Sequence, residues 1–324
     1  MAIVIVSAAF LVAAAFAVVM GYAVQRGATC MVAAVDEVVS HRRVTRVLAL
    51  GEAALWVTGG LFVAIHLGLL TQAPQGFAFS VWPILGGALL GAGALVNRAC
   101  VFGTIARFGS GEWAYALTPI GFFLGCLTAA PVLMGIHSTP LTTPSLLYQL
   151  PRWVAVLIVP VLSWRAYEAV VAARARKFGA HVWAPHQATT VIGIAFVVMM
   201  LTVGGWAYTE LLSEWATNGM ALNSLPRALL FVALLSGAVA GGWTSRKIRW
   251  KLPTAGAAVR CLAGGWLMGL GSLLTPGGND GLVLVGIPLL LPHAWSAIAA
   301  MIVTIAIGLM LQRRSRTPLV ATAR

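Results

Sequence analysis

The chain has 324 residues, of which 60% are hydrophobic and only 9% are charged, and its mean hydropathy is +0.92. A soluble domain of this size cannot bury so much apolar surface, so the composition indicates a polytopic integral membrane protein without a separate soluble domain. The net charge of +13 does not indicate nucleic-acid binding. The basic residues stand in short clusters between apolar runs, as the positive-inside rule expects of cytoplasmic loops.

Apolar runs predict nine membrane-spanning helices. The first half of the chain holds four of them, at about 2–24, 45–70, 82–108 and 113–135. A single span follows at about 152–172. The second half holds the other four, at about 189–208, 226–243, 258–291 and 293–312. A short amphipathic piece at 31–39 follows the first span, and an acidic loop with Glu210 and Glu214 follows the sixth.

Basic clusters give the expected orientation in the membrane. They lie at 41–46, 174–177, 246–251 and 313–316. Placing every cluster in the cytoplasm puts the N-terminus outside and the C-terminus inside, with 313–324 as a cytoplasmic tail. The N-terminus lacks a basic n-region, so we expect a first membrane helix there and not a cleaved signal. The expected location is a bacterial-type cytoplasmic (inner) membrane.

An internal repeat relates the two halves. Residues 86–103, GGALLGAGALVNRACVFG, share seven of eighteen positions with residues 264–281, GGWLMGLGSLLTPGGNDG, at an offset of 178 residues. The same offset carries each span of the first half onto a span of the second. The odd span between them would turn the second half upside down, which predicts a 4+1+4 inverted repeat. The transport domain then covers 1–312, with repeat halves at about 1–136 and 179–312 and a linker helix at about 152–172.

Both copies of the repeated segment break near their middle, at 97–100 and at 275–279. A helix that breaks near the membrane midplane exposes backbone groups, which are tolerated only where they line a cavity or are buried. The helix N-termini at such breaks favour an anion. Arg98 adds a positive charge if it faces inward; the alternative is that it extends to an interface. Asp280 opposes anion binding unless it caps a helix or pairs with an arginine.

The four cysteines show neither CxxC nor metal-ligand spacing, so we expect neither a disulfide framework nor a metal site. Cys126 and Cys261 are interpreted as small buried hydrophobic residues. Cys30 and Cys100 each follow a polar interruption that carries an arginine, Arg26 in the first case. For these two, the pattern leaves both a buried and a functional role open.

Two ionisable residues, Glu52 and His66, fall in the second predicted span. Such residues are costly in a membrane, so a proton relay is one interpretation. The alternatives are that Glu52 pairs with the nearby basic loop and that His66 is packed or interfacial.

Three stretches resemble the YeeE/YedE family of sulfur-compound transporters: GYAVQRGATCMVAA, GGALLGAGALVNRACVFGTIARFGSGEW and LAGGWLMGLGSLLTPGGNDG. The resemblance covers both halves. It implies an inverted-repeat, channel-like fold with short helices entering from both sides, and central cysteines that pass thiosulfate along by sulfur-directed hydrogen bonds. Cys30 and Cys100 match the first two of the family's cysteines. At the second break the family usually has GGC, whereas this chain has PGGND, so Gly278 or Asn279 replaces the third thiol.

These observations predict a permease that takes up a small sulfur-containing anion, with the lipid bilayer as its surroundings. The expected substrate pathway is formed by Arg26, Cys30, Asn97, Arg98, Cys100, Gly278 and Asn279. No cofactor, metal or enzymatic activity is predicted. One alternative is a membrane sulfur relay, in which a cysteine persulfide passes sulfur to a cytoplasmic sulfur-carrier protein. Another is a structural subunit of a larger complex, which would leave both breaks unexplained.

Overall fold

A computed structural model describes residues 7–70, 74–133, 139–142, 145–175, 182–245, 248 and 250–315. The chain is all-α in these ranges, where only two isolated β-bridges occur. The long helices are α2 (Ala8–Arg26), α4 (Thr45–His66), α5 (Val81–Asn97), α7 (Leu117–Leu133), α9 (Ala155–Arg174), α10 (Pro185–Val203), α12 (Leu225–Thr244), α13 (Ala255–Leu274) and α15 (Pro292–Arg314). The shorter ones are α3 (Met31–His41), α6 (Val101–Gly109), α8 (Leu146–Gln149), α11 (Tyr208–Asn218), α14 (Asn279–Gly281) and the π-helix η5 (Leu282–Gly286), besides the 3-10 turns η1 (Trp113–Ala116), η2 (Arg152–Val154) and η4 (Leu222–Ser224).

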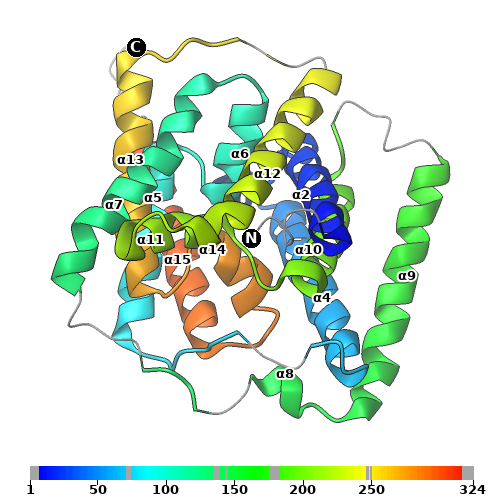
Figure 1. Ribbon diagram of the computed structural model, residues 1–324. Helices are drawn as coiled ribbons and strands as arrows, with labels where there is room; N and C mark the ends of the chain where they lie inside the picture. The colour runs from blue at the N-terminus through cyan, green and yellow to red at the C-terminus, as the bar shows by residue number, and fades with distance from the viewer. Residues whose placement is uncertain are drawn as a thin grey trace.

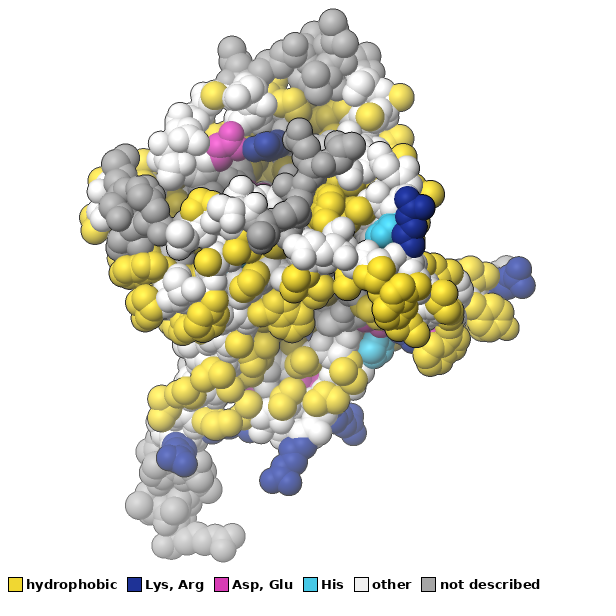
Figure 2. Space-filling view, turned by 90° about the horizontal axis from the view of Figure 1, so that it is seen from below, with side chains coloured by type: hydrophobic (Ala, Val, Ile, Leu, Met, Phe, Trp, Pro, Cys, Tyr) yellow, Lys and Arg dark blue, Asp and Glu magenta, His cyan; other side chains and the backbone are white. Residues whose placement is uncertain are grey.

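Nine helical segments within the described ranges are long and apolar enough to cross a membrane. Apolar side chains also form a broad band across the middle of the face seen in Figure 2, and Lys and Arg side chains lie toward its margins. Large apolar side chains that face outward are stable only where lipid surrounds them. The prediction of an all-α, multi-pass membrane protein is therefore confirmed.

The long helices form two groups of four, which Figure 1 shows side by side. In one group α12 packs against α2, α2 against α10, and α10 against α4; in the other α7 packs against α13, α13 against α5, and α5 against α15. Short helices occupy the space between the groups. For example, α3 contacts α4 of the first group and α15 of the second, and α11 contacts α12 and α7.

The two halves of the chain match element by element. Adding 178 to the bounds of α2, α3, α4, α5 and α7 gives the bounds of α10, α11, α12, α13 and α15 to within four residues. The contacts between helices correspond as well. Since α10 is the equivalent of α2 and α12 is the equivalent of α4, the contact of α2 with α12 corresponds to the contact of α10 with α4. These correspondences are what an internal repeat requires. The inversion of one half against the other stays a prediction.

Glycines allow α5 and α13 to cross in close contact. A Cβ atom on Gly93 would lie 2.7 Å from the Gly264 carbonyl oxygen, and one on Gly86 would lie 2.5 Å from that of Gly271. Gly264 and Gly271 are the repeat equivalents of Gly86 and Gly93. The offset therefore relates the contact of Gly93 with Gly264 to the contact of Gly86 with Gly271. Small residues at such crossings let membrane helices pack through their backbones.

Gly93→Ala should therefore destabilise the fold, because backbone atoms of α13 cannot move as a flexible side chain can. We expect a loss of about 1–3 kcal/mol, the usual range for overpacking, seen as a lower unfolding temperature in detergent. Gly256→Ala is the matched control in α13, since its Cβ would meet nothing within 4 Å. Equal stability of the two variants would contradict the close crossing.

The linker helix α9 stands at the edge of the bundle (Figure 1) and is held there by buried Glu52 of α4. The Glu52 carboxylate accepts hydrogen bonds from Arg165 of α9 at 2.5 Å and 2.8 Å and lies 2.5 Å from Nδ1 of His186. Glu52 thus pairs with α9 and α10, and the expected pairing with the basic loop at 41–46 is wrong. His66 packs on the Phe62 ring and lies 2.9 Å from the Phe62 carbonyl oxygen, as expected of a packed histidine.

Two predicted boundaries need correction. The stretch expected as an acidic loop contains the helix α11, because Leu211, Leu212 and Ala216 give it an apolar face that packs inward. The second break is also followed by much less helix than expected. Only α14 and the π-helix η5 follow it, and the chain then turns before α15 begins at Pro292. The broken span at 82–108 is confirmed, with α5 ending at Asn97 and α6 beginning at Val101.

Candidate functional site

The first break is held open by Asn97 and Arg98. Arg98 takes the left-handed conformation, with φ of 60°, and ends α5. The fully buried Asn97 amide donates to the Ala99 carbonyl at 2.8 Å and to Thr104 at 3.0 Å, and it accepts from Thr118 at 3.0 Å. Asn97 thus replaces the backbone hydrogen bonds that the break removes. Its side chain is not among those that line the pocket described below.

Two thiols lie at the starts of the short helices α3 and α6. Cys30 is the N-cap residue of α3, and the fully buried Cys100 is the N-cap residue of α6. The thiols are neighbours, because the N–H of Met31, the residue after Cys30, donates to Cys100 Sγ, and neither cysteine forms a disulfide. Gly103 allows this approach, because a Cβ atom there would lie 2.5 Å from the Cys30 sulfur.

The first turns of α3 and α6 meet at the thiols. The Met31 N–H at the start of α3 donates to Cys100 Sγ at 3.1 Å, and Cys100 is itself the N-cap residue of α6. The unpaired donors and the positive ends of both helix dipoles therefore lie beside the sulfur atoms. This geometry favours an anion beside the sulfur atoms.

A pocket of about 440 Å³ leads to Cys30. Its charged lining consists of Asp36, Arg46, Arg98 and Arg107. Arg46 pairs with Glu37 and Arg107 pairs with Glu112, whereas the side chain of exposed Arg98 makes no ion pair or hydrogen bond with any described residue. Arg98 is therefore the lining arginine whose charge is left for an anion in the pocket.

At the second break, a carboxylate makes the contact that a thiol makes at the first break. Gly278, the N-cap residue of α14, stands 178 residues after Cys100. Buried Asp280 accepts hydrogen bonds from the Thr209 hydroxyl and, at 3.4 Å, from the Thr209 N–H at the start of α11. Since Thr209 is the repeat equivalent of Met31, this contact mirrors the one from Met31 to Cys100. Asp280 thus caps a helix, one of the two roles expected for it, and it does so for α11.

Asn279 and Glu210 lie next to this carboxylate. The Asn279 side chain is fully buried, and neither its amide nitrogen nor its amide oxygen has a partner among the described residues. Glu210 lies on α11, which is not one of the apolar spans, and a Cβ atom on Gly281 would lie 2.7 Å from its Oε1. Burial, and secondarily the Asp280 charge, raise the pKa of Glu210 to about 7.

Arg26 and the two other cysteines do not line the pocket. Arg26 is buried and donates to the Tyr22 hydroxyl at 2.7 Å and to Thr244 at 2.9 Å. Cys126 lies 3.4 Å from the Gly269 carbonyl oxygen, and Cys261 is buried in a small cluster around Tyr115, against which Cys30 packs. Both have the packed environment expected of structural cysteines. In the described residues, no group of three or more His, Cys, Asp or Glu side chains could hold a metal ion.

Tyr208 and Thr209 at the second break were not predicted as site residues. Tyr208 donates to the Val101 carbonyl at 3.1 Å and so connects the start of α11 to the first break. Counting 178 residues from Cys30 and Met31 leads to these two positions, so the repeat offset could have found them.

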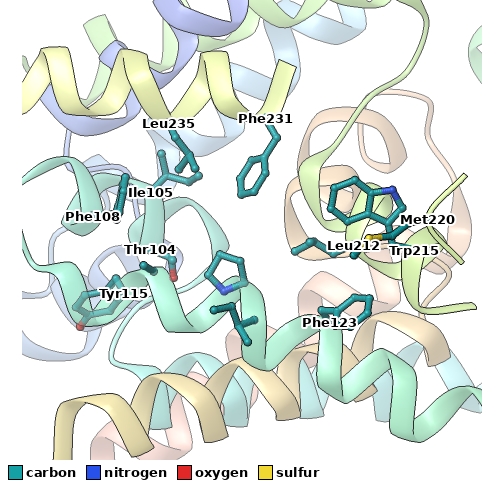
Figure 3. Close-up of a pocket in the computed structure, with 13 residues that line it drawn as sticks. Thr104, Ile105, Phe108, Tyr115, Phe123, Leu212, Trp215, Met220, Phe231 and Leu235 are labelled. Carbon is teal, nitrogen blue, oxygen red and sulfur yellow. The ribbon is translucent and has the colours of Figure 1, made fainter. Parts of the chain in front are cut away.

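The chain also has an apolar pocket of about 350 Å³ between α6, α7, α11 and α12, shown in Figure 3. Phe123, Trp215 and Phe231 are among its lining residues, and its only polar side-chain groups are hydroxyl groups and the indole N–H. The Trp215 N–H is already bonded to Ser224 at 2.6 Å. Such a lining cannot replace the hydration of a charged substrate, so this pocket is not the anion site.

Comparison with known proteins identifies a family. The sequence model of a family described as sulphur transport matches residues 26–307. No curated protein matches the chain in sequence.

Proposed function

The chain belongs to the sulphur transport family, and from this premise we propose that it is a permease for a small sulfur-containing anion of the thiosulfate kind. The family assignment confirms the resemblance to YeeE/YedE proteins. The observation that carries the proposal is the pair of neighbouring thiols, Cys30 and Cys100, at two helix N-termini beside an arginine-lined pocket. Helix N-termini and Arg98 balance the charge of the anion, and the thiols offer weak donors to its sulfur atom.

The proposed pathway runs from the second break to the pocket. The anion would enter near Gly278 and Asn279, pass Cys100 and Cys30, and leave past Arg98. Asn97 supports this route by holding the conformation of the first break. Arg26 supports it by its hydrogen bonds at the end of α2. In this proposal the halves at about 1–136 and 179–312 form an inverted repeat whose two breaks lie near the membrane midplane.

The pocket is proposed to open to the cytoplasm. Its rim includes Arg46, and a neighbouring pocket is lined by His41 and Arg43 of the same basic cluster. The positive-inside rule places that cluster in the cytoplasm of a bacterial-type inner membrane. A cytoplasmic sulfur-carrier protein could then collect the anion's sulfur at this opening.

Reporter fusions test the orientation. A cytoplasmic reporter fused after residue 177 and another fused at the C-terminus should both be active, because each follows a basic cluster, 174–177 or 313–316. Reporters on opposite sides of the membrane would contradict the even number of spans expected between them and, with it, the inverted repeat.

Uptake by the reconstituted protein tests the function itself. Proteoliposomes with the full chain should accumulate labelled thiosulfate in preference to labelled sulfate, because only thiosulfate carries a terminal sulfur atom for the thiols. Labelled sulfite separates recognition of that sulfur from recognition of the oxygens. Absence of thiosulfate uptake together with a trapped persulfide on Cys100 would favour the sulfur relay instead.

A further inference from the structure

A small cavity of about 10 Å³ lies at the second break, and its lining corresponds to that of the open pocket at the first. Three pairs of lining residues are related by the 178-residue offset: Ala28 and Trp206, Cys30 and Tyr208, and Ala106 and Leu284. In each pair the second residue is the larger. Side chains therefore fill most of the space beside the second break, whereas the space beside the first is open.

Trp206 leaves an unused hydrogen-bond donor in this lining. The side chain is 4% exposed, and its indole N–H has no partner among the described residues. An indole N–H can only donate, and a buried donor without a partner is costly. It therefore indicates a ligand with an acceptor atom, such as an oxygen of the transported anion.

Asp280 lines the same cavity, and its negative charge, when ionised, disfavours the binding of an anion there. It is 3% exposed and forms no ion pair with a described Lys or Arg side chain. An ionised carboxylate about 4 Å from the anion would lower the affinity by roughly a thousandfold under partly buried conditions. A protonated carboxyl group has no such charge and can itself donate to the anion.

We propose that Asp280 carries a proton whenever the anion passes Trp206 at the second break, where side chains must move aside to admit it, so that anion uptake is coupled to proton uptake. The proposal rests on the proposed function and supplies its energy source. The Asp280 carboxylate takes a proton from water on the outer side, holds it while the anion passes, and releases it on the cytoplasmic side. One proton thus crosses with each anion, and no covalent bond other than O–H is made or broken.

The neighbouring charged groups are few. From α11, Tyr208 and Glu210 face Asp280, and Glu214 lies farther along the helix in an ion pair with Arg227 of α12. On the side of α6, the Cys100 thiol stands at the N-cap, and η5 contributes no titratable group. Glu210 is negative or neutral, so it opposes the ionised form of Asp280 and does not compensate its charge.

Proteoliposomes with a pH-sensitive dye inside test the coupling. Adding labelled thiosulfate should acidify the interior along with uptake, and an inward proton gradient should speed uptake. Asp280→Asn keeps an acceptor for Thr209 but is always neutral, so it should transport thiosulfate with at least tenfold less acidification. Glu214→Gln, the same kind of change at an exposed ion pair of α11, should behave like the unsubstituted protein.

A second variant keeps the test decisive if Asp280→Asn does not fold. Trp206→Phe removes the indole N–H, and the half-saturation concentration for thiosulfate should rise roughly tenfold with the protons per anion unchanged. Thiosulfate uptake without acidification, or uptake that depends on sodium instead of protons, would overturn the coupling and leave the permease intact. No uptake by the unsubstituted protein would overturn the permease itself.

Discussion

Cys100→Ala is expected to abolish most thiosulfate uptake while leaving the protein folded. The substitution removes one fully buried sulfur atom, which costs about 1–2 kcal/mol of stability as a packing change. It also removes the thiol that faces Cys30 and the Met31 N–H at the meeting point of α3 and α6. Loss of one hydrogen bond to a charged ligand reduces binding by roughly ten- to a hundredfold. Uptake of labelled thiosulfate at matched expression measures the effect.

Cys126→Ala and Cys261→Ala are the matched controls for Cys100→Ala. Both side chains are fully buried, as Cys100 is, but neither lines the open pocket. Their packing cost should be similar and their uptake nearly unchanged. Equal uptake in all three variants would refute the cysteine pathway and leave a generic anion permease.

A cysteine at the second break should be tolerated at one of its two candidate positions only. On Gly278 a Cβ atom would overlap the Thr209 hydroxyl and lie 2.6 Å from the Thr209 Cβ atom. Gly278→Cys should therefore cost about 1–3 kcal/mol through overpacking and disturb the contact between Thr209 and Asp280. Unfolding temperature and thiosulfate uptake should both fall.

Asn279→Cys is the companion variant with the opposite expected result. Its amide is buried without a partner, so replacing it removes an unpaired polar group. The fold should persist, and activity should increase or shift towards thiosulfate. A Gly278→Cys protein as stable as Asn279→Cys would contradict the packing of Thr209 against α14. Unchanged substrate preference in Asn279→Cys would show that the second break does not contact substrate.

The long helices could be predicted because an apolar run of about twenty residues matches the thickness of a bilayer and is rare in soluble proteins. The first break was equally visible, since Asn97 and Arg98 interrupt such a run. The helix α11 was missed because its acidic residues suggested a loop, whereas its buried leucines face one side only. A short helix with a weak apolar face is stabilised by the helices around it, and those neighbours are not adjacent in sequence.

The candidate site was only partly predictable. The resemblance to a known family singled out Cys30 and Cys100, but their mutual contact depends on how α3 and α6 meet. The contact of Asp280 with Thr209 joins residues 71 positions apart, and the pattern of the sequence offered two roles for the carboxylate. Glu52 likewise pairs with side chains of α9 and α10. These partners are distant in sequence, so the residues around Glu52 could not identify them.

The most direct test is whether the anion protects Cys30, the thiol that lines the open pocket. A membrane-impermeant alkylating reagent, applied to the face bearing the basic clusters, should modify Cys30 in a protein that carries Cys126→Ala and Cys261→Ala. We expect thiosulfate to slow this modification in a concentration-dependent way and sulfate at the same ionic strength to slow it far less. Modification at the same rate with and without thiosulfate would contradict this expectation.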